Sequence, residues 1–298
     1  MSKHSVSQAP ASLGEVRCHL GEGPAYDVAS DTAFWFDILE RRLFEADLGT
    51  GAVESHDLPL MASALATVDD ERQLVATESG LYLRSRLDGA MTLLRAVEAD
   101  DATTRSNDAR AHPGGAFWFS MMGKDAKPGA ASIYALSGGE VVPLFSGLTI
   151  PNAICFSADG TQGFFADTAK NELYRVALEP VTGLPRGAPS LLRLSDDGKG
   201  LDGAVTDREG LIWIARWGGS RIDVLTDQGD TVRSLAVPAR QPSCPLFIGQ
   251  AFDRLMVTTA QEGQDEAERA ADPQGGATFV LTPGAVGKPE PRVRLGAH

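Results

Sequence analysis

Four oxygen-bearing side chains recur at nearly the same distance ahead of a strand-like apolar run. They are Glu22, Asn107, Asn152 and Asp202, which lie 14, 12, 13 and 12 residues before the equivalent apolar residue of each run. Asn is a poor strand former, so its place directly before a buried-looking segment calls for an explanation. Carboxylate and carboxamide oxygens suit Ca²⁺, Mg²⁺ or Mn²⁺, and Zn²⁺ or Fe²⁺ remain open. The pattern predicts a divalent metal site; the alternative is a set of turn formers and polar residues in a wet channel.

The elements that must position these side chains repeat along the chain. Six short runs are rich in aromatic and branched residues, as strands are: "AFWFDI", "QLVATE", "AFWFSM", "GFFADT", "LIWIAR" and "LMVTTA". Their equivalent residues are separated by 39, 44, 46, 49 and 43 positions. A turn precedes each run and a second strand-like segment follows it. A repeat of about 45 residues with four short strands is typical of a propeller blade.

The repeat therefore predicts an all-β protein, a six-bladed β-propeller with four-stranded antiparallel blades around a central channel. We expect one domain over residues 1–298, with residues 1–12 as a flexible tail. Innermost strands line the channel, so residues at one phase form a ring at one mouth. In the two other repeats this phase falls near Ser63 and on Cys244. The alternative fold is a β-sandwich of unrelated hairpins.

Composition narrows the function. The chain has 298 residues, a net charge of −13 and a pI near 4.8, which disfavours binding to nucleic acid or to anionic membranes. No apolar run reaches the roughly 18 residues of a membrane helix. Three cysteines at wide spacing argue against a disulfide framework and favour a reducing compartment. We expect a cytoplasmic protein with no nucleic-acid or membrane partner.

Other catalytic motifs are missing from the sequence. It holds no G-x-S-x-G elbow, no Walker lysine motif and no H-E-x-x-H. Cys244 has no evident His partner, so we interpret it as a packing residue. Trp217 lies either in a blade core or at the channel mouth. The acidic stretch 97–104 is interpreted as a solvated loop, with a lid over the site as the alternative.

Five segments together resemble the senescence marker protein / gluconolactonase / luciferin-regenerating enzyme family, which includes regucalcin. They are "CHLGEGPAYD" (18–27), "TRSNDARAHPGGAFWFSMMG" (104–123), "PNAICFSADG" (151–160), "DGAVTDREGLIWIARWGG" (202–219) and "PSCPLFIG" (242–249). They occur in family order over nearly the whole chain. The resemblance implies a six-bladed propeller, in agreement with the repeat count.

The resemblance also implies roles for single residues. Glu22, Asn152 and Asp202 would be the protein ligands of one divalent metal. Asp202 would also be the candidate general base, with a second carboxylate or a metal hydroxide as the alternatives. Asn107 would lie beside the metal and contact substrate or a water on the metal. Arg105 would donate hydrogen bonds to substrate hydroxyls.

One segment departs from the family pattern. Regucalcin uses a Glu in the third blade to hold the sugar lactone, whereas this sequence reads "SMMGKDAKPG". Lys124 or Asp125 is expected to take the place of that Glu. The segment is more similar to bacterial aldonolactonases of pentose and hexose catabolism.

The resemblance therefore implies a metal-dependent hydrolase that opens sugar lactones to aldonic acids. The oligomeric state, monomer or dimer, stays open. Two alternatives stay open. One is a calcium-dependent phosphotriesterase-like hydrolase, which would favour an apolar mouth. The other is a calcium-binding regulator without catalysis.

Overall fold

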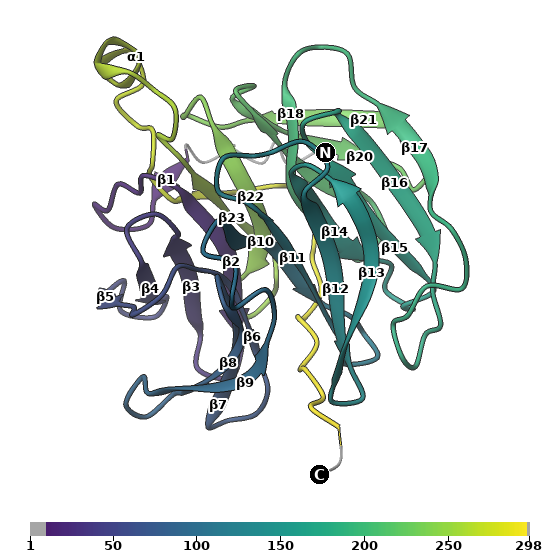
Figure 1. The fold of residues 1–298 in the computed structure, drawn as a ribbon. Coiled ribbons are helices and arrows are strands. Elements are labelled where there is room, and N and C mark those ends of the chain that lie inside the picture. The colour runs from purple at the N-terminus through teal and green to yellow at the C-terminus, as the bar shows by residue number, and fades with distance from the viewer. Residues whose placement is uncertain (1–9, 297–298) are drawn as a thin grey trace.

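Each predicted repeat forms one four-stranded antiparallel sheet in the computed structural model, which describes residues 10–296. The sheets are arranged around a common axis as the six blades of a β-propeller (Figure 1). The first three blades are β2 (Gly21–Asp27), β3 (Thr32–Asp37), β4 (Arg42–Asp47) and β5 (Val53–Asp57); β6 (Ala62–Thr67), β7 (Arg72–Thr77), β8 (Gly80–Ser85) and β9 (Met91–Ala96); and β10 (Thr104–Ala111), β11 (Phe117–Gly123), β12 (Ala131–Ser137) and β13 (Glu140–Leu148).

The next two blades are β14 (Pro151–Phe156), β15 (Gln162–Asp167), β16 (Glu172–Ala177) and β17 (Ser190–Leu194); and β18 (Gly200–Thr206), β19 (Ile212–Trp217), β20 (Arg221–Leu225) and β21 (Thr231–Ala236). The sixth consists of β22 (Pro242–Ile248), β23 (Arg254–Thr259), β24 (Phe279–Leu281) and β1 (Ala11–Ser12). The six strand-like runs of the sequence are the second strands of their blades. The propeller prediction is confirmed.

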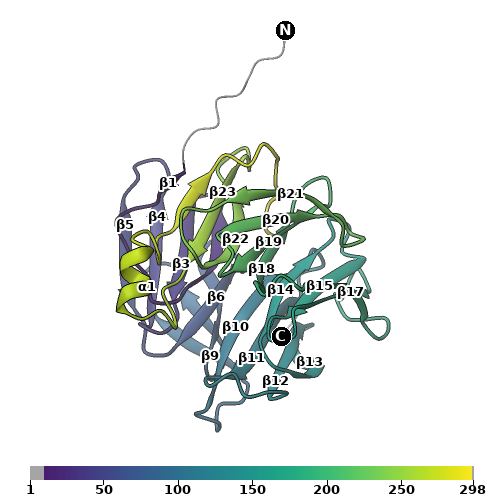
Figure 2. The same cartoon turned by 90° about the horizontal axis from the view of Figure 1, so that it is seen from above.

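The ring is closed by pairing the two ends of the chain in blade 6. Strand β1 lies antiparallel to β24, with Ala11 opposite Val280 and Ser12 opposite Phe279. The view down the channel shows β1 beside the last strands of the chain (Figure 2). The prediction of a flexible tail over residues 1–12 is wrong for Ala11 and Ser12, because sheet pairing holds them. Residues 1–9 lie outside the described residues.

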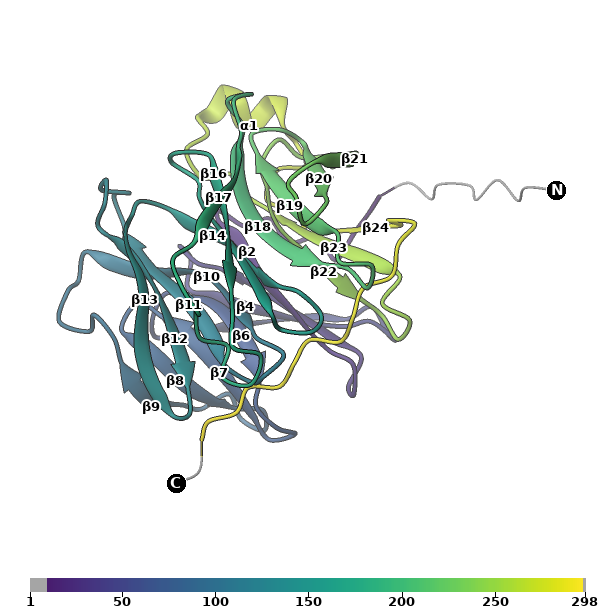
Figure 3. The same ribbon diagram turned by 90° about the vertical axis from the view of Figure 1, so that its right-hand side faces the viewer.

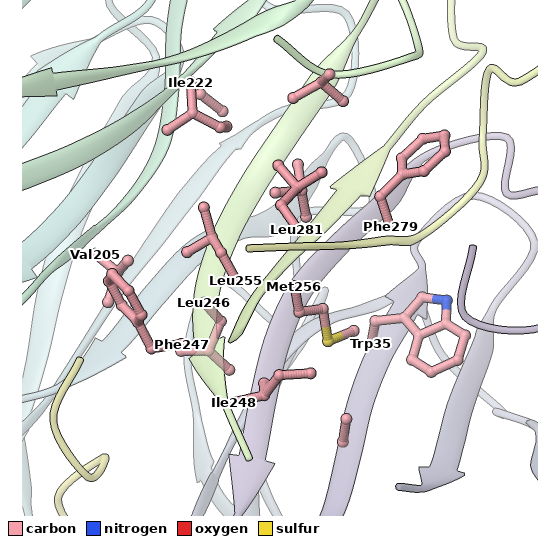
Figure 4. Close-up of a cluster of buried hydrophobic side chains, with 14 of the residues drawn as sticks. Trp35, Val205, Ile222, Leu246, Phe247, Ile248, Leu255, Met256, Phe279 and Leu281 are labelled. Atoms are coloured by element: carbon pink, nitrogen blue, oxygen red, sulfur yellow. The ribbon is translucent and has the colours of Figure 1, made fainter. Parts of the chain in front are cut away.

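Hydrophobic layers between neighbouring blades form the core. The largest cluster joins blades 5, 6 and 1, where Ile222, Met256 and Trp35 gather from three different sheets (Figure 4). The second strands are buried at every residue or at all but one terminal residue, because both of their faces meet a neighbouring blade. Burial on both faces explains why these runs are almost continuously apolar in the sequence.

One helix, α1 (Glu266–Ala271), lies between β23 and β24. The Asp265 carboxylate caps it by accepting a hydrogen bond from the Glu268 backbone N–H, and the Glu268 carboxylate accepts one from the Asp265 backbone N–H. Such a capping box stabilises a helix of this length. Among residues 10–296, no helix has both the length and the apolar composition of a membrane-crossing segment.

Candidate metal centre

The four oxygen-bearing residues lie near the beginning of the innermost strand of their blades. Glu22, Asn107, Asn152 and Asp202 are all buried and line one pocket of about 210 Å³. Arg105 lines the same pocket. Residues separated by as many as 180 positions in the sequence thus face a single cavity, as the repeat phase predicted.

A break in strand pairing accompanies each of these residues. In all six blades the register between the first and second strand shifts at this level, as in a β-bulge. In blade 4 the shift falls between Asn152 and Cys155, and Ala153 adopts a left-handed conformation with φ 56°. Gly23 has the same conformation in blade 1, directly after Glu22. Bulges redirect side chains, so an Asn at this point serves the channel rather than the sheet.

The segments that lead into the ring are fixed by the second strands. Asp37, at the end of β3, accepts hydrogen bonds from the backbone N–H groups of His19 and Leu20. Asp167, at the end of β15, accepts equivalent bonds from Thr149 and Ile150. The entry to the strand is therefore anchored two or three residues before Glu22 and before Asn152.

The amide of Asn152 belongs to a chain of hydrogen bonds along the pocket wall. Arg105 Nη1 donates to Asn107 Oδ1 at 2.7 Å, and Asn107 Nδ2 donates to Asn152 Oδ1 at 2.9 Å. Asn152 Nδ2 donates to Thr168 Oγ1 at 2.9 Å, and this hydroxyl donates to the Leu201 carbonyl. The chain fixes both amide orientations and leaves Asn152 Oδ1 one further lone pair.

Three carboxylates are crowded in low-dielectric surroundings near this pocket. Burial, followed by the charge of Asp108, raises the pKa of Glu22 to about 8. Burial and the charges of Glu22 and Asp108 raise the pKa of Asp202 well above its usual range. Burial also raises the pKa of Asp108 to about 6, although Arg110 opposes the shift. Glu22 and Asp202 are therefore both ionised at neutral pH only if a cation compensates them.

The donor chemistry fits a hard divalent cation. Glu22 and Asp202 supply carboxylates and Asn152 supplies a carbonyl oxygen, the donors that Ca²⁺, Mg²⁺ and Mn²⁺ prefer. Within residues 10–296, no three His, Cys, Asp or Glu side chains gather in a way that could hold a metal. A cation at the ring would therefore depend on the Asn152 oxygen as its third protein ligand.

The other two blades contribute no ligand at this level. Ser63 is fully buried and its hydroxyl donates to Ser106 Oγ at 2.8 Å. Cys244 packs against Gly203, where an added Cβ would lie 2.4 Å from the Cys244 sulfur. Burial raises the pKa of the Cys244 thiol well above its usual range, so the sulfur stays protonated. The geometry agrees with a packing role for Cys244.

The two residues expected to replace the family's Glu differ in position. Lys124 lines the pocket, and its Nζ lies 2.7 Å from Glu78 Oε2 and 2.9 Å from the Ala102 carbonyl. Asp125 is exposed and does not line the pocket; its Oδ1 accepts the Lys127 backbone N–H. Trp217 lines the pocket mouth and is half-buried.

Sequence reasoning missed two carboxylates. Asp108 follows Asn107 inside the bulge, where its Oδ2 accepts the Ile154 backbone N–H at 2.7 Å. Glu262, from the loop before α1, lines the pocket, and its charge opposes the lowering of the Arg105 pKa by burial. The adjacent "ND" was a usable signal for Asp108, whereas no repeat phase marks the loop of Glu262.

Known proteins of similar sequence and structure cover almost the whole chain. A Rhizobium meliloti protein named "Putative sugar lactone lactonase" is 46% identical over 95% of this chain and 96% of its own. L-arabinolactonase of Azospirillum brasilense is 31% identical over 93% and 92%. The crystal structure of a calcium-binding protein, regucalcin, from Agrobacterium tumefaciens has a TM-score of 0.93 and 46% identity, over 95% and 97%. Residues 20–261 match the SMP-30/gluconolactonase/LRE-like region, and the chain belongs to this family.

Proposed function

We propose that the protein is a divalent-metal-dependent lactonase that opens sugar lactones to aldonic acids. One observation carries the proposal: Glu22, Asn152 and Asp202 share a pocket of about 210 Å³ with Arg105 and Asn107. The pocket thus combines cation donors with groups that bind hydroxyls. The lactonase names of the relatives support a cyclic ester as the substrate.

Hydrolysis of a lactone needs polarisation of the carbonyl, a water molecule and a base. A bound divalent cation polarises a carbonyl and lowers the pKa of water. Asp202 takes the proton of the attacking water at a carboxylate oxygen, because it lines the pocket whereas Asp108 does not. The water oxygen then bonds to the carbonyl carbon, the bond to the ring oxygen breaks, and Asp202 returns the proton to that oxygen. One water is consumed and one acid is formed.

The remaining polar groups orient the substrate. Arg105 is buried and charged, with donors beyond the one that it gives to Asn107. Lys124 keeps one donor free of Glu78 and Ala102. These donors suit the hydroxyls of a polyol lactone better than the apolar arms of a phosphotriester. Three free, buried cysteines support a reducing, cytoplasmic setting.

The test is a proton-release assay on a panel of aldonolactones, with phosphotriesters and simple aryl esters as comparison substrates. The protein is stripped with a chelator and refilled with Ca²⁺, Mg²⁺, Mn²⁺ or Zn²⁺ in turn. We expect turnover of lactones only after metal is restored. Turnover confined to phosphotriesters would replace this proposal with a phosphotriesterase. Tight calcium binding without any turnover would indicate a calcium-binding regulator.

A further inference from the structure

The last described segment of the chain, residues 286–296, crosses the end of the channel opposite to the pocket. We call it the C-terminal strap. It belongs to no sheet, yet its backbone bonds to several blades: Gly287 N donates to Phe252 O in blade 6, and Val293 N to Thr67 O in blade 2. Figure 3 shows this yellow segment running from β24 across the molecule toward the C-terminus.

One strap carboxylate joins three blades. Glu290 Oε1 accepts from Arg110 Nη1 of blade 3 at 2.8 Å, and Glu290 Oε2 accepts from the Tyr26 backbone N–H of blade 1 at 3.3 Å. The other terminal nitrogen of Arg110 donates to the Ala204 carbonyl of blade 5 at 3.1 Å. Blades 1, 3 and 5 are thus bonded to one another through a single ion pair.

One ammonium group of the strap joins blade 4 to blade 5. Lys288 Nζ donates to the Phe156 carbonyl of blade 4 at 2.9 Å and to Thr206 Oγ1 of blade 5 at 2.6 Å. Glu290 and Lys288 together therefore contact blades 1, 3, 4 and 5. These are the blades whose innermost strands hold the ring, namely Glu22, Asn107, Asn152 and Asp202.

The contacts lie on the same strands as the ring residues and only a short distance further along. Tyr26 follows Glu22 by four residues, Arg110 follows Asn107 by three, and Ala204 follows Asp202 by two. At about 3.3 Å per residue, these separations are roughly 7–13 Å. Apolar packing between blades is non-directional, whereas a metal site needs its donors held within about 0.5 Å.

We propose that Glu290 and Lys288 are positioning residues that fix the innermost strands of four blades relative to one another. The ring at the other end of the channel can then bind its cation. This inference rests on the proposed function. Buried or half-buried ion pairs contribute little net stability compared with apolar residues of the same shape. Charged side chains that link the four blades are thus better explained by the need to fix the relative positions of the ring residues than by a gain in stability.

The test uses the full chain with Glu290→Gln and Lys288→Met, singly and together. Arg292→Ala is the matched control, because Arg292 lies in the same strap but pairs with Asp70 in an exposed ion pair of 2.7 Å. Calcium affinity, the excitation spectrum of bound Eu³⁺, and the unfolding midpoint of the calcium-free protein are measured for each variant. Lactone kcat and KM are measured on the calcium-loaded proteins.

We expect Glu290→Gln and Lys288→Met each to weaken calcium affinity about tenfold and to broaden the Eu³⁺ spectrum. We expect Arg292→Ala to match the wild type in affinity and spectrum. If Glu290→Gln does not fold, Glu290→Asp keeps the charge with a shorter reach and should weaken affinity about threefold.

Two outcomes would overturn the inference, and they are distinguishable. Variants that lower the unfolding midpoint but keep calcium affinity within twofold of wild type would reduce the strap to a structural closure. Wild-type protein that neither binds calcium nor hydrolyses lactones would overturn the proposed function, and the positioning role with it.

Discussion

The two ends of the channel are built from the same innermost strands but differ in the charges that they hold and in the regularity of their strand pairing. At the pocket end, Glu22 and Asp202 line a cavity of about 210 Å³, and burial together with the nearby charge of Asp108 raises the pKa of both. At the strap end, Glu290 and Arg110 form an ion pair, and the cavity beside the strap holds about 80 Å³. The pocket end is lined by more acidic than basic side chains, whereas the strap end has the Glu290 carboxylate paired with an arginine.

The strand pairing differs in the same way. Near the pocket, the first two strands of every blade lose register and Ala153 adopts a left-handed conformation. Toward the strap, the same strands pair regularly, as Phe156 does with Gly163. Between the first and second strands of each blade, irregular pairing is thus confined to the end where ligands are needed, and regular pairing at the other end supports it.

The largest effect is expected from Asp202→Ala, which removes a pocket carboxylate that the account makes both ligand and base. Lactone kcat/KM should fall about 10³-fold or more, because base and cation are lost together. Steady-state kinetics at saturating calcium measure the change. Asp227→Asn is the control, because Asp227 is an exposed turn residue of the same blade. Retention of a tenth of wild-type kcat/KM in Asp202→Ala would contradict the assigned role.

A second large effect is expected from Gly23→Ala at the bulge after Glu22. The added Cβ would lie 1.8 Å from the Ser63 carbonyl, at a φ of +54°. We expect a loss of about 3 kcal/mol in the free energy of unfolding, from overpacking and backbone strain. Urea unfolding measures it. Ala153→Gly, at the same phase of blade 4, should stay within about 1 kcal/mol of wild type, because relief of the left-handed strain at φ 56° offsets the added entropy of the unfolded chain.

An intermediate effect concerns pH. The pKa of Glu22 is raised from 4.5 to about 8, so the folded protein favours the neutral carboxyl. The contribution of this preference to the free energy of unfolding is fully present below pH 4.5 and is lost as pH rises through about 8. Between pH 6 and 9, the unfolding midpoint of chelator-treated protein should fall by roughly 5 °C relative to Glu22→Gln. Saturating calcium should abolish this difference. Equal slopes for both chelated proteins would show that Glu22 is ionised without a cation.

The smallest effect distinguishes two neighbouring residues at the pocket mouth. Lys124→Met should raise the lactone KM about threefold to tenfold with little change in kcat, because it removes a donor that lines the pocket. Asp125→Asn should leave both parameters unchanged, since Asp125 is turned to solvent. The reverse pattern in steady-state kinetics would indicate that Asp125 contacts the substrate.

The predictable part of this molecule is the part that repeats. Second strands such as Phe117–Gly123 are buried on both faces, which leaves a strong apolar signal every 39 to 49 residues. The phase of that signal was sufficient to predict that Glu22 and Asp202 lie at one pocket. Residues outside the repeat were not accessible in this way: Glu262 sits in a loop, and Glu290 meets Arg110 across 180 positions.

The direction of a side chain could also not be predicted from the sequence where the residue lies in a turn instead of a strand. Lys124 and Asp125 are adjacent, yet only Lys124 reaches the pocket, because the Asp125 carboxylate bonds back to the Lys127 backbone. The closing strand β1 was missed for a related reason. Ala11 and Ser12 carry no strand signal of their own, and only their pairing with β24 defines them.

The most direct test of the metal centre follows calcium binding and lactone turnover in one titration. Chelator-treated protein at known concentration is titrated with calcium while bound calcium and initial rate are recorded together. We expect one high-affinity calcium per chain and a rate that rises in proportion to calcium occupancy, with no rise in Asn152→Ala at the same calcium concentrations. Full activity in the chelated protein, or occupancy of the site without any gain in rate, would contradict a catalytic metal centre.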